Sequence, residues 1–208
     1  PAGSPLIKDI DRVLEAGERA ASLVKQILAF SRQDSIERVP LELVPLIKQA
    51  IKLLRPALPT TISIHQHLPD ACDAILADPT QMHQVLMNLC TNAFHAMEQN
   101  GGTLSIEVRS RELQIADLLD RPQVQPGRFV ELVISDTGTG IAPEIRSKIF
   151  DPYFTTKGVG KGTGMGLAIT HGIVTAAGGF ITCASEMGKG TTFTIYFPAV
   201  TTTMSHTA

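Results

Sequence analysis

The chain has 208 residues, of which 43% are hydrophobic and 18% charged. This composition supplies a core for one domain with a small appendage, and it carries too little charge for a disordered chain. Its 18 Lys and Arg against 20 Asp and Glu give a formal net charge of -2. Non-specific nucleic-acid binding needs an excess of basic residues, so we expect no nucleic-acid partner. Three cysteines without a CxxC pair favour neither a disulfide framework nor a zinc site.

The first part of the chain has the pattern of a bundle helix. Apolar and small residues recur at alternating spacings of three and four between Leu6 and Ser31, with no Pro among them. Polar residues then cluster up to Arg38, and Pro40 and Pro45 follow, which indicates the end of the helix and a linker. We therefore divide the chain into a helical segment at 1–34, a main domain at 35–200 and a frayed tail at 201–208.

Helix and strand patterns alternate through the main domain. The apolar spacing predicts helices at 43–58, 79–100, 143–149 and 164–177, and strands at 61–67, 74–76, 102–108, 129–135, 179–185 and 191–197. Asp78 before Pro79 has the character of a helix N-cap followed by Pro at the first helical position. A polar loop is expected between Val108 and Phe129. This order predicts an α/β fold, a two-layer sandwich of a mixed β-sheet with helices on one face.

Glycines are concentrated in one short stretch, at Gly138, Gly140, Gly158, Gly160, Gly162, Gly164 and Gly166. Such a cluster indicates unusual backbone angles or close approach of backbone amides to a ligand. The run at 160–167 leads into an apolar helix, whose N-terminus would offer N–H groups and a positive dipole end to a phosphate chain. A flexible hinge without a ligand is the alternative. Neither GxxxxGK[ST] nor a GxGxxG after a strand occurs, so the P-loop and dinucleotide motifs do not apply.

Two further groups have a chemical interpretation. Asn88 and Asn92 are four residues apart and so share one helix face. Their neutral oxygens suit a Mg²⁺ already neutralised by a triphosphate, although helical asparagines are more often solvated or bonded locally. Asp136 follows an apolar strand, where an ionised carboxylate would accept from the amino group of adenine and oppose the carbonyl of guanine. An ordinary turn is the alternative for Asp136.

Taken in order, five motifs resemble those of the ATP-binding domain of sensor histidine kinases. This domain belongs to the Bergerat-fold superfamily that also holds type II topoisomerases, Hsp90 chaperones and MutL proteins. The motifs are an N box at 84–93, a first glycine box at 136–141, an F box at 149–154, a second glycine box at 162–167 and a turn at 188–193. The resemblance covers almost the whole chain, because the helix at 1–34 is similar to the second helix of the family's dimerisation and phosphoacceptor hairpin.

The resemblance implies roles for individual residues. Asn92 would ligate Mg²⁺ with Asn88 close by, and Asp136 would hold the adenine amino group. The segment from Phe150 to Lys161 would form a lid, with Lys157 or Lys161 reaching phosphate. The catalytic residues would be Asn88, Asn92 and Lys157. The nucleotide-contacting set that the resemblance implies is Asn88, Asn92, His95, Asp136, Gly138, Gly140, Ile141, Phe150, Lys157, Gly162, Thr163, Gly164, Met165, Gly166, Leu167 and Thr192.

None of the six histidines lies in the family's phosphoacceptor setting. We therefore expect a catalytic fragment that binds ATP and Mg²⁺ and transfers the γ-phosphate to a histidine on a helix absent from this chain, without autophosphorylating alone. The resemblance further implies that the phosphate passes on to the receiver domain of a response regulator and that the full-length protein is a homodimer. It also implies a cytoplasmic location for this chain, in a full-length protein that a membrane anchor could hold.

Two other functions remain open. The chain could bind nucleotide or dimerise without transferring phosphate, or it could be an ATPase of the same superfamily. The water-splitting members carry a glutamate four residues before the metal-binding Asn, where this chain has Asn88. Because an amide cannot accept a proton at neutral pH, Asn88 favours transfer over hydrolysis.

Overall fold

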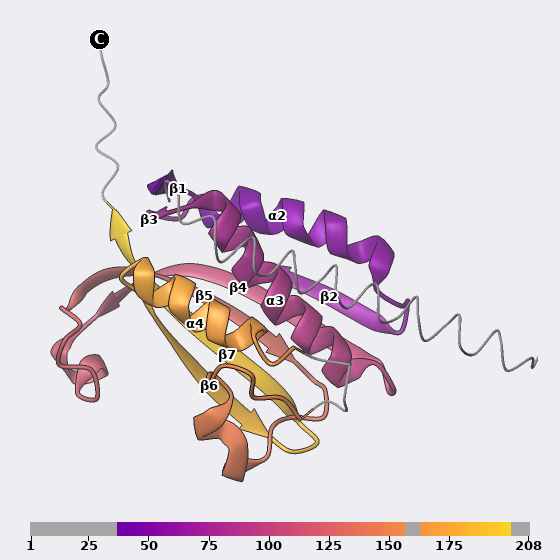
Figure 1. Ribbon diagram of the computed structural model, residues 1–208. Helices are drawn as coiled ribbons and strands as arrows, with labels where there is room; N and C mark the ends of the chain where they lie inside the picture. The colour runs from indigo at the N-terminus through magenta and orange to yellow at the C-terminus, as the bar shows by residue number, and fades with distance from the viewer. Residues whose placement is uncertain (1–36, 157–162, 201–208) are drawn as a thin grey trace, which may run out of the picture. The chain divides into compact units, whose positions relative to one another are not determined.

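One mixed sheet of seven strands lies within residues 37–156 and 163–200, the parts of the chain that the computed structural model describes (Figure 1). The strand order is β1-β3-β7-β5-β4-β2, and β6 also pairs with β7. Among these strands β2 and β4 run parallel, and every other pair is antiparallel. The strands are β1 (Val39–Leu41), β2 (Ile62–His67), β3 (Ala74–Ala77), β4 (Gly102–Leu113), β5 (Gly127–Asp136), β6 (Phe180–Glu186) and β7 (Gly190–Val200).

Within the described residues, three α-helices cover one face of this sheet (Figure 1). They are α2 (Leu43–Leu54), α3 (Pro79–Met97) and α4 (Gly166–Ala176), and α3 packs against both of the others. Short 3₁₀ turns occur at η1 (Arg55–Ala57), η2 (Ile115–Leu118) and η3 (Pro143–Lys148). The predicted two-layer α/β sandwich is confirmed.

The core lies between the helices and the central strands. Alternate residues of a strand point to the same face, so each central strand sends every second side chain toward the helices. These buried strand residues are Leu104, Ile106 and Val108 of β4, Val130, Leu132 and Ile134 of β5, and Phe193, Ile195 and Phe197 of β7. They meet an apolar stripe of α3 formed by Val85, Leu86, Leu89 and Ala93.

The β4–β5 pair is longer than the sequence predicts. The expected loop begins after Val108, but β4 continues to Leu113 and β5 begins at Gly127. Charged residues hide this extension from a hydrophobicity pattern, because they pair across the strands on the face away from the helices. Glu131 is only 2% exposed there, and it accepts hydrogen bonds from Arg109 and Arg111.

A second difference lies at the start of the domain. The segment around Pro40 is expected as a linker, but it forms β1, which pairs antiparallel with β3. Proline is tolerated because β1 is an edge strand. One row of backbone groups on such a strand makes no hydrogen bonds to a neighbouring strand, so the missing N–H of Pro40 costs no hydrogen bond there. The predicted helix at 43–58 ends instead at Leu54, followed by a 3₁₀ turn containing Pro56. The predicted helical segment at 1–34 and the tail at 201–208 lie outside the described residues.

Candidate functional site

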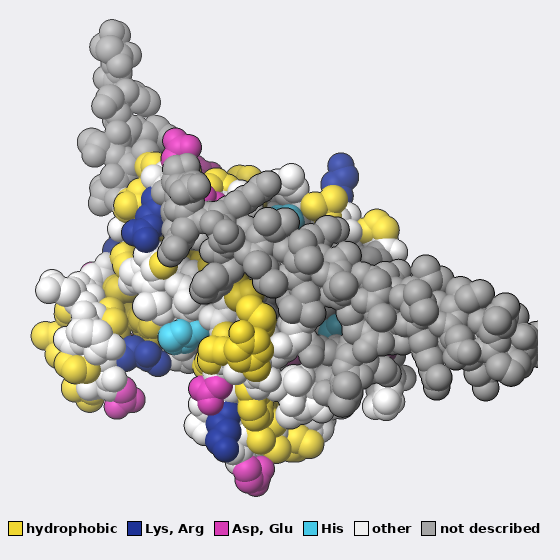
Figure 2. Space-filling model, viewed as in Figure 1, with side chains coloured by type: hydrophobic (Ala, Val, Ile, Leu, Met, Phe, Trp, Pro, Cys, Tyr) yellow, Lys and Arg dark blue, Asp and Glu magenta, His cyan; other side chains and the backbone are white. Residues whose placement is uncertain are grey.

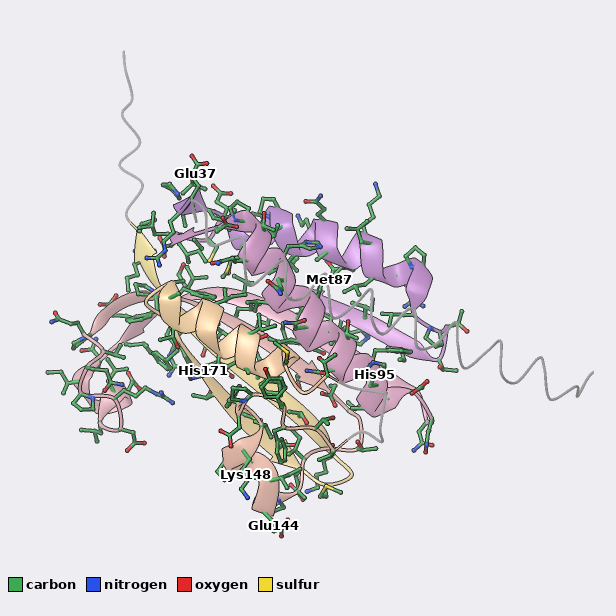
Figure 3. The ribbon with its side chains drawn as sticks, in the orientation of Figure 1. Glu37, Met87, His95, Glu144, Lys148 and His171 are labelled. Atoms are coloured by element: carbon green, nitrogen blue, oxygen red, sulfur yellow. The ribbon has the colours of Figure 1, made fainter. Side chains whose placement is uncertain are left out.

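Helix α3 carries the first group of predicted site residues. Asp78 caps its N-terminus, since the carboxylate accepts hydrogen bonds from the N–H groups of Thr80 at 2.8 Å and Gln81 at 3.0 Å. Asn88, Asn92 and His95 follow at i, i+4 and i+7, which places them along one face of the helix. Figure 3 shows His95 in the last turn of α3.

The two asparagines have different surroundings. The amide nitrogen of Asn88 donates to the carbonyl oxygen of Gly166 at 3.1 Å and to the hydroxyl of Thr170 at 3.4 Å. These bonds link α3 to the first turn of α4 and leave the Asn88 oxygen without a donor from α4. Asn92 is half-buried, and its side chain has no hydrogen-bond partner within the described residues. Asn88 therefore lies beside the start of α4, and Asn92 follows one turn along the same face of α3.

The start of α4 supplies the second group. The helix begins at Gly166 after Met165, which makes no side-chain cap. The first N–H groups of a helix have no intrahelical acceptor, and together with the helix dipole they favour an anion. Leu167 anchors this turn by packing against the hydrophobic core. Gly164, at φ +66°, is pressed so closely against the backbone of Tyr153 that a side chain would collide there.

Asp136 lies at the end of β5 and is 7% exposed. The N–H of Gly138 donates to its carboxylate at 2.9 Å. Burial raises the pKa of Asp136 above its usual range, and the backbone N–H groups of Gly138 and Thr191 partly oppose this by stabilising the ionised form. The result is a hydrogen-bond acceptor held in a nearly dry environment.

Gly138 and Gly140 are explained first by packing within the protein. A Cβ on Gly138 would lie 2.6 Å from the carbonyl oxygen of Ala96, so the absence of a side chain lets this loop lie directly on α3. Gly140 has φ +72°, and a Cβ there would lie even closer to protein backbone, 2.1 Å from the carbonyl oxygen of Glu186. Both glycines thus hold Asp136 between α3 and the β6–β7 hairpin, and the glycine spacing alone could not distinguish this role from ligand contact.

Ile141 and Phe150 also have defined contacts. The N–H of Ile141 donates to the hydroxyl of Ser185 at 2.8 Å. The Phe150 ring lies 5.4 Å from the His171 ring and 6.4 Å from the Phe193 ring, measured between centroids. Figure 2 shows hydrophobic side chains gathered at the surface beside a histidine on the face that carries α4. Phe150 therefore joins the segment after η3 to α4 and β7.

Thr192 is not brought to Asp136. Its hydroxyl bonds to the hydroxyl of Ser135 at 2.8 Å, on the sheet face away from the helices. The residue beside Asp136 is Thr191, which is 5% exposed and is its register partner on β7. The sequence analysis missed Thr191. Strand alternation could have found it, because Thr191 shares a face with the buried Phe193.

The structure does not place four predicted residues at the site. Lys157 and Gly162 lie outside the described residues, as does Lys161. Thr163 belongs to a separate unit of the chain, so no contact to the site is assigned to it.

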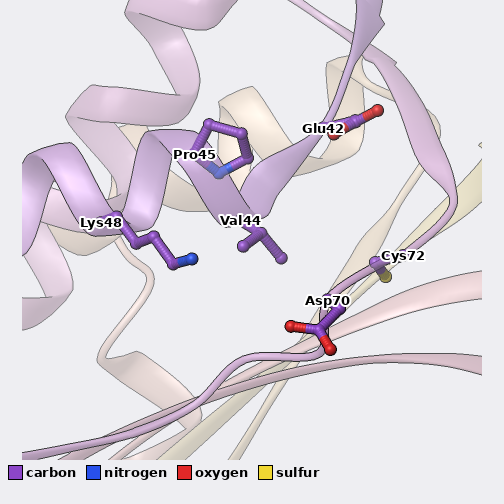
Figure 4. A pocket seen from close by; sticks show the side chains of 6 residues that line it. All are labelled: Glu42, Val44, Pro45, Lys48, Asp70 and Cys72. Carbon is purple, nitrogen blue, oxygen red and sulfur yellow. The ribbon is translucent and has the colours of Figure 1, made fainter.

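A concavity of about 310 Å³ lies elsewhere, at the start of α2 (Figure 4). It is lined by Glu42, Val44, Pro45, Lys48, Asp70 and Cys72, none of which belongs to the predicted site. Within the described parts of the chain no helix has the length and apolar character needed to span a bilayer.

Comparisons with known proteins identify the family of this chain. A family model described as "Histidine kinase-, DNA gyrase B-, and HSP90-like ATPase" matches residues 77–201. The sensor kinase CckA of Brucella abortus is 40% identical over 199 residues, which are 95% of this chain and 21% of CckA. The sensor histidine kinase ZraS of Escherichia coli K12 is 33% identical over 199 residues, which are 95% of this chain and 39% of ZraS. The chain thus spans only a minor part of these relatives.

Solved structures show the same fold. The histidine kinase ThkA, in complex with the response regulator TrrA, is 25% identical with a TM-score of 0.70, over 96% of this chain and 53% of ThkA. Full-length ShkA in complex with AMPPNP is 25% identical with a TM-score of 0.69, over 96% of this chain and 40% of ShkA. The chain belongs to the histidine kinase-, DNA gyrase B- and HSP90-like ATPase family, and its fold is that of a sensor histidine kinase catalytic domain.

Proposed function

We propose that this chain binds Mg²⁺-ATP and transfers the γ-phosphate to a histidine carried by another helix. The observation that carries the proposal is the bond from Asn88 on α3 to Gly166 at the N-terminus of α4, with Asn92 one turn along the same face of α3. This arrangement places oxygen ligands for a cation next to N–H groups for an anion, as a metal-chelated phosphate chain requires.

The donor set fits magnesium. Mg²⁺ prefers oxygen ligands, and bound to a nucleotide it would neutralise phosphate charge during transfer. Asn92 would provide one oxygen, because its carboxamide has no competing partner within the described residues. Asn88 would provide another, because its nitrogen is already engaged by Gly166 and Thr170.

The remaining residues would orient the nucleotide. Asp136 would accept a hydrogen bond from the adenine amino group, with Thr191 as its neighbour on β7. The first turn of α4, at Gly166 and Leu167, would bind phosphate through backbone N–H groups. His95 lies on the same face of α3 as the two asparagines and would face the phosphates. Lys157 would add positive charge from the segment after Phe154.

The relatives support a kinase over a hydrolase. CckA and ZraS are sensor kinases by name, ShkA was solved with AMPPNP, and ThkA was solved with a response regulator. By analogy the full-length protein would be a cytoplasmic-facing homodimer that passes phosphate to a receiver-domain aspartate. Hydrolysis is disfavoured because Asn88, where the hydrolases carry a glutamate, cannot act as a general base.

Transfer can be tested with a separate polypeptide that carries an acceptor histidine on a helix. We expect label from [γ-³²P]ATP on that polypeptide in the presence of Mg²⁺, and loss of the label when the histidine is replaced. Release of free phosphate without labelling would instead identify an ATPase. Binding without either product would leave a nucleotide-binding module.

Asn92→Ala tests the site itself. Loss of the half-buried carboxamide should weaken Mg²⁺-ATP binding at least tenfold, by roughly the 1.4 kcal/mol or more expected when a charged group loses its partner. Isothermal titration calorimetry measures the dissociation constant. Asn100→Ala makes the same chemical change at an exposed position beyond α3 and should leave affinity unchanged. Equal affinities of the Asn92→Ala variant and the parent would remove Asn92 from the site.

A further inference from the structure

Thr170 is a buried polar residue on α4 that no proposed step uses. Its side chain is 0% exposed, and its apolar neighbours on α4 include Ile173 and Val174. The hydroxyl donates to the carbonyl oxygen of Gly166 at 2.9 Å, one turn earlier in the helix. A hydroxyl has a single proton, so this bond leaves the Thr170 oxygen as an acceptor only.

That acceptor faces the carboxamide of Asn88. The Asn88 nitrogen lies 3.4 Å from the Thr170 hydroxyl oxygen and 3.1 Å from the Gly166 carbonyl oxygen. The NH₂ group of an asparagine only donates hydrogen bonds, so it suits a position that faces two acceptors. If the carboxamide were rotated by half a turn, its own oxygen would instead meet two oxygens, one of which has already given its proton to the other.

We propose that Thr170 is a positioning residue that fixes the orientation of the Asn88 carboxamide, so that the amide nitrogen faces α4 and the amide oxygen stays available to a cation. The proposal rests on the Mg²⁺-ATP function proposed above, and Thr170 acts only through Asn88. Valine has nearly the shape of threonine and suits the same buried position. The hydroxyl is therefore the part of this side chain that matters for Asn88.

The first test compares nucleotide affinity with and without metal. Thr170→Val removes the hydroxyl, and Thr170→Ser keeps it. We expect Thr170→Val to weaken ATP binding about three- to tenfold with Mg²⁺ present, the size of one lost hydrogen bond, and to leave binding in excess EDTA unchanged. Thr170→Ser should retain the affinity of the parent.

A matched control is Thr182→Val on β6. The Thr182 hydroxyl also donates to a carbonyl oxygen, that of Thr194 at 3.4 Å, but it does not contact Asn88. We expect its ratio of affinities with and without Mg²⁺ to equal that of the parent. An equal loss in Mg²⁺ and in EDTA for Thr170→Val would show a purely structural role and overturn the proposal, as would no loss at all.

A second readout needs no nucleotide. In the ligand-free protein, NMR should show slowed solvent exchange for the side-chain amide proton of Asn88 that faces α4, and Thr170→Val or Thr170→Ala should speed this exchange. An unprotected proton in the parent would overturn the proposal. This measurement stands even if the parent fails to bind Mg²⁺-ATP, a result that would refute the proposed function alone. If the valine variant does not fold, the serine and alanine variants carry both measurements.

Discussion

At Asp136 the proposed recognition of adenine opposes stability at a single residue. The carboxylate is nearly buried, and this burial raises its pKa even though Gly138 and Thr191 donate to it. A raised pKa means that the folded protein binds a proton at this site more readily than the unfolded chain does. Recognition of the adenine amino group needs the ionised form, which is the form that folding disfavours.

Asp136→Asn should therefore change the pH dependence of stability. The stability that protonation of Asp136 contributes is complete below the unfolded pKa of about 3.9 and is lost as pH rises through the higher folded pKa. Asparagine does not titrate, so the free energy of unfolding of the variant, relative to the parent, should rise as the pH increases from about 4 through the folded pKa of Asp136. Urea unfolding at several pH values measures this difference.

The control for that experiment is Asp120→Asn, at an exposed position of the β4–β5 connection. The difference in free energy of unfolding between Asp120→Asn and the parent should not rise with pH in the same way. The Asp136→Asn variant should also bind ATP more weakly and discriminate less against GTP, because an amide can donate to the guanine carbonyl. A flat pH profile for the Asp136→Asn difference would contradict the burial argument.

At the scale of elements, α3 combines a packed face with the face that carries the proposed binding residues. Its apolar stripe lies in the core, while Asn88, Asn92 and His95 occupy the neighbouring stripe. The start of the helix is held by Asp78, at the opposite end from His95. Stability and binding can therefore be separated experimentally along this helix.

Asp78→Ala should lower the free energy of unfolding by about 1 kcal/mol, as expected for a lost N-cap. Asp78→Asn keeps an oxygen that can accept these hydrogen bonds, so it should lose only part of this free energy of unfolding. Neither change should alter the dissociation constant for Mg²⁺-ATP, because the cap does not contact the site residues. Urea unfolding and calorimetry provide the two values. If Asp78→Ala destabilised no more than Asp120→Ala, the cap would have no energetic role.

At the scale of the whole molecule, the site is assembled from segments far apart in the sequence. Asn88 and Asn92 come from α3, Asp136 from the end of β5, and Gly166 from α4. The sheet and the α3–α4 contact bring these segments together only in the folded state. A ligand that contacts all of them can bind the native protein and not the unfolded chain.

Mg²⁺-ATP should therefore stabilise the folded protein by mass action. At a free concentration of 100 times the dissociation constant, we expect about 2.7 kcal/mol of added stability. Thermal unfolding with increasing Mg²⁺-ATP gives the shift in Tm, and Asn92→Ala should show a much smaller shift at the same concentrations. A parent Tm independent of Mg²⁺-ATP would contradict the proposed site.

The sequence by itself determined the α/β class, most helices and strands, and the cap at Asp78, because local periodicity and capping are properties of neighbouring residues. The five ordered motifs also predicted the family. The sequence did not determine β1, because Pro40 is acceptable in a strand only at the edge of a sheet. It also did not determine the outer half of β4 and β5, where Arg109 and Glu131 stabilise each other across the strands.

Only the tertiary structure decided which residues meet. It placed Thr191 rather than Thr192 beside Asp136, because strand register sets the face of each side chain. It also showed that Gly138 packs on Ala96 and that the Asn88 nitrogen bonds to Gly166 and Thr170. Such contacts join residues up to 82 positions apart. Periodicity describes one helix or strand at a time. It therefore carries no information about the packing between elements that creates these contacts.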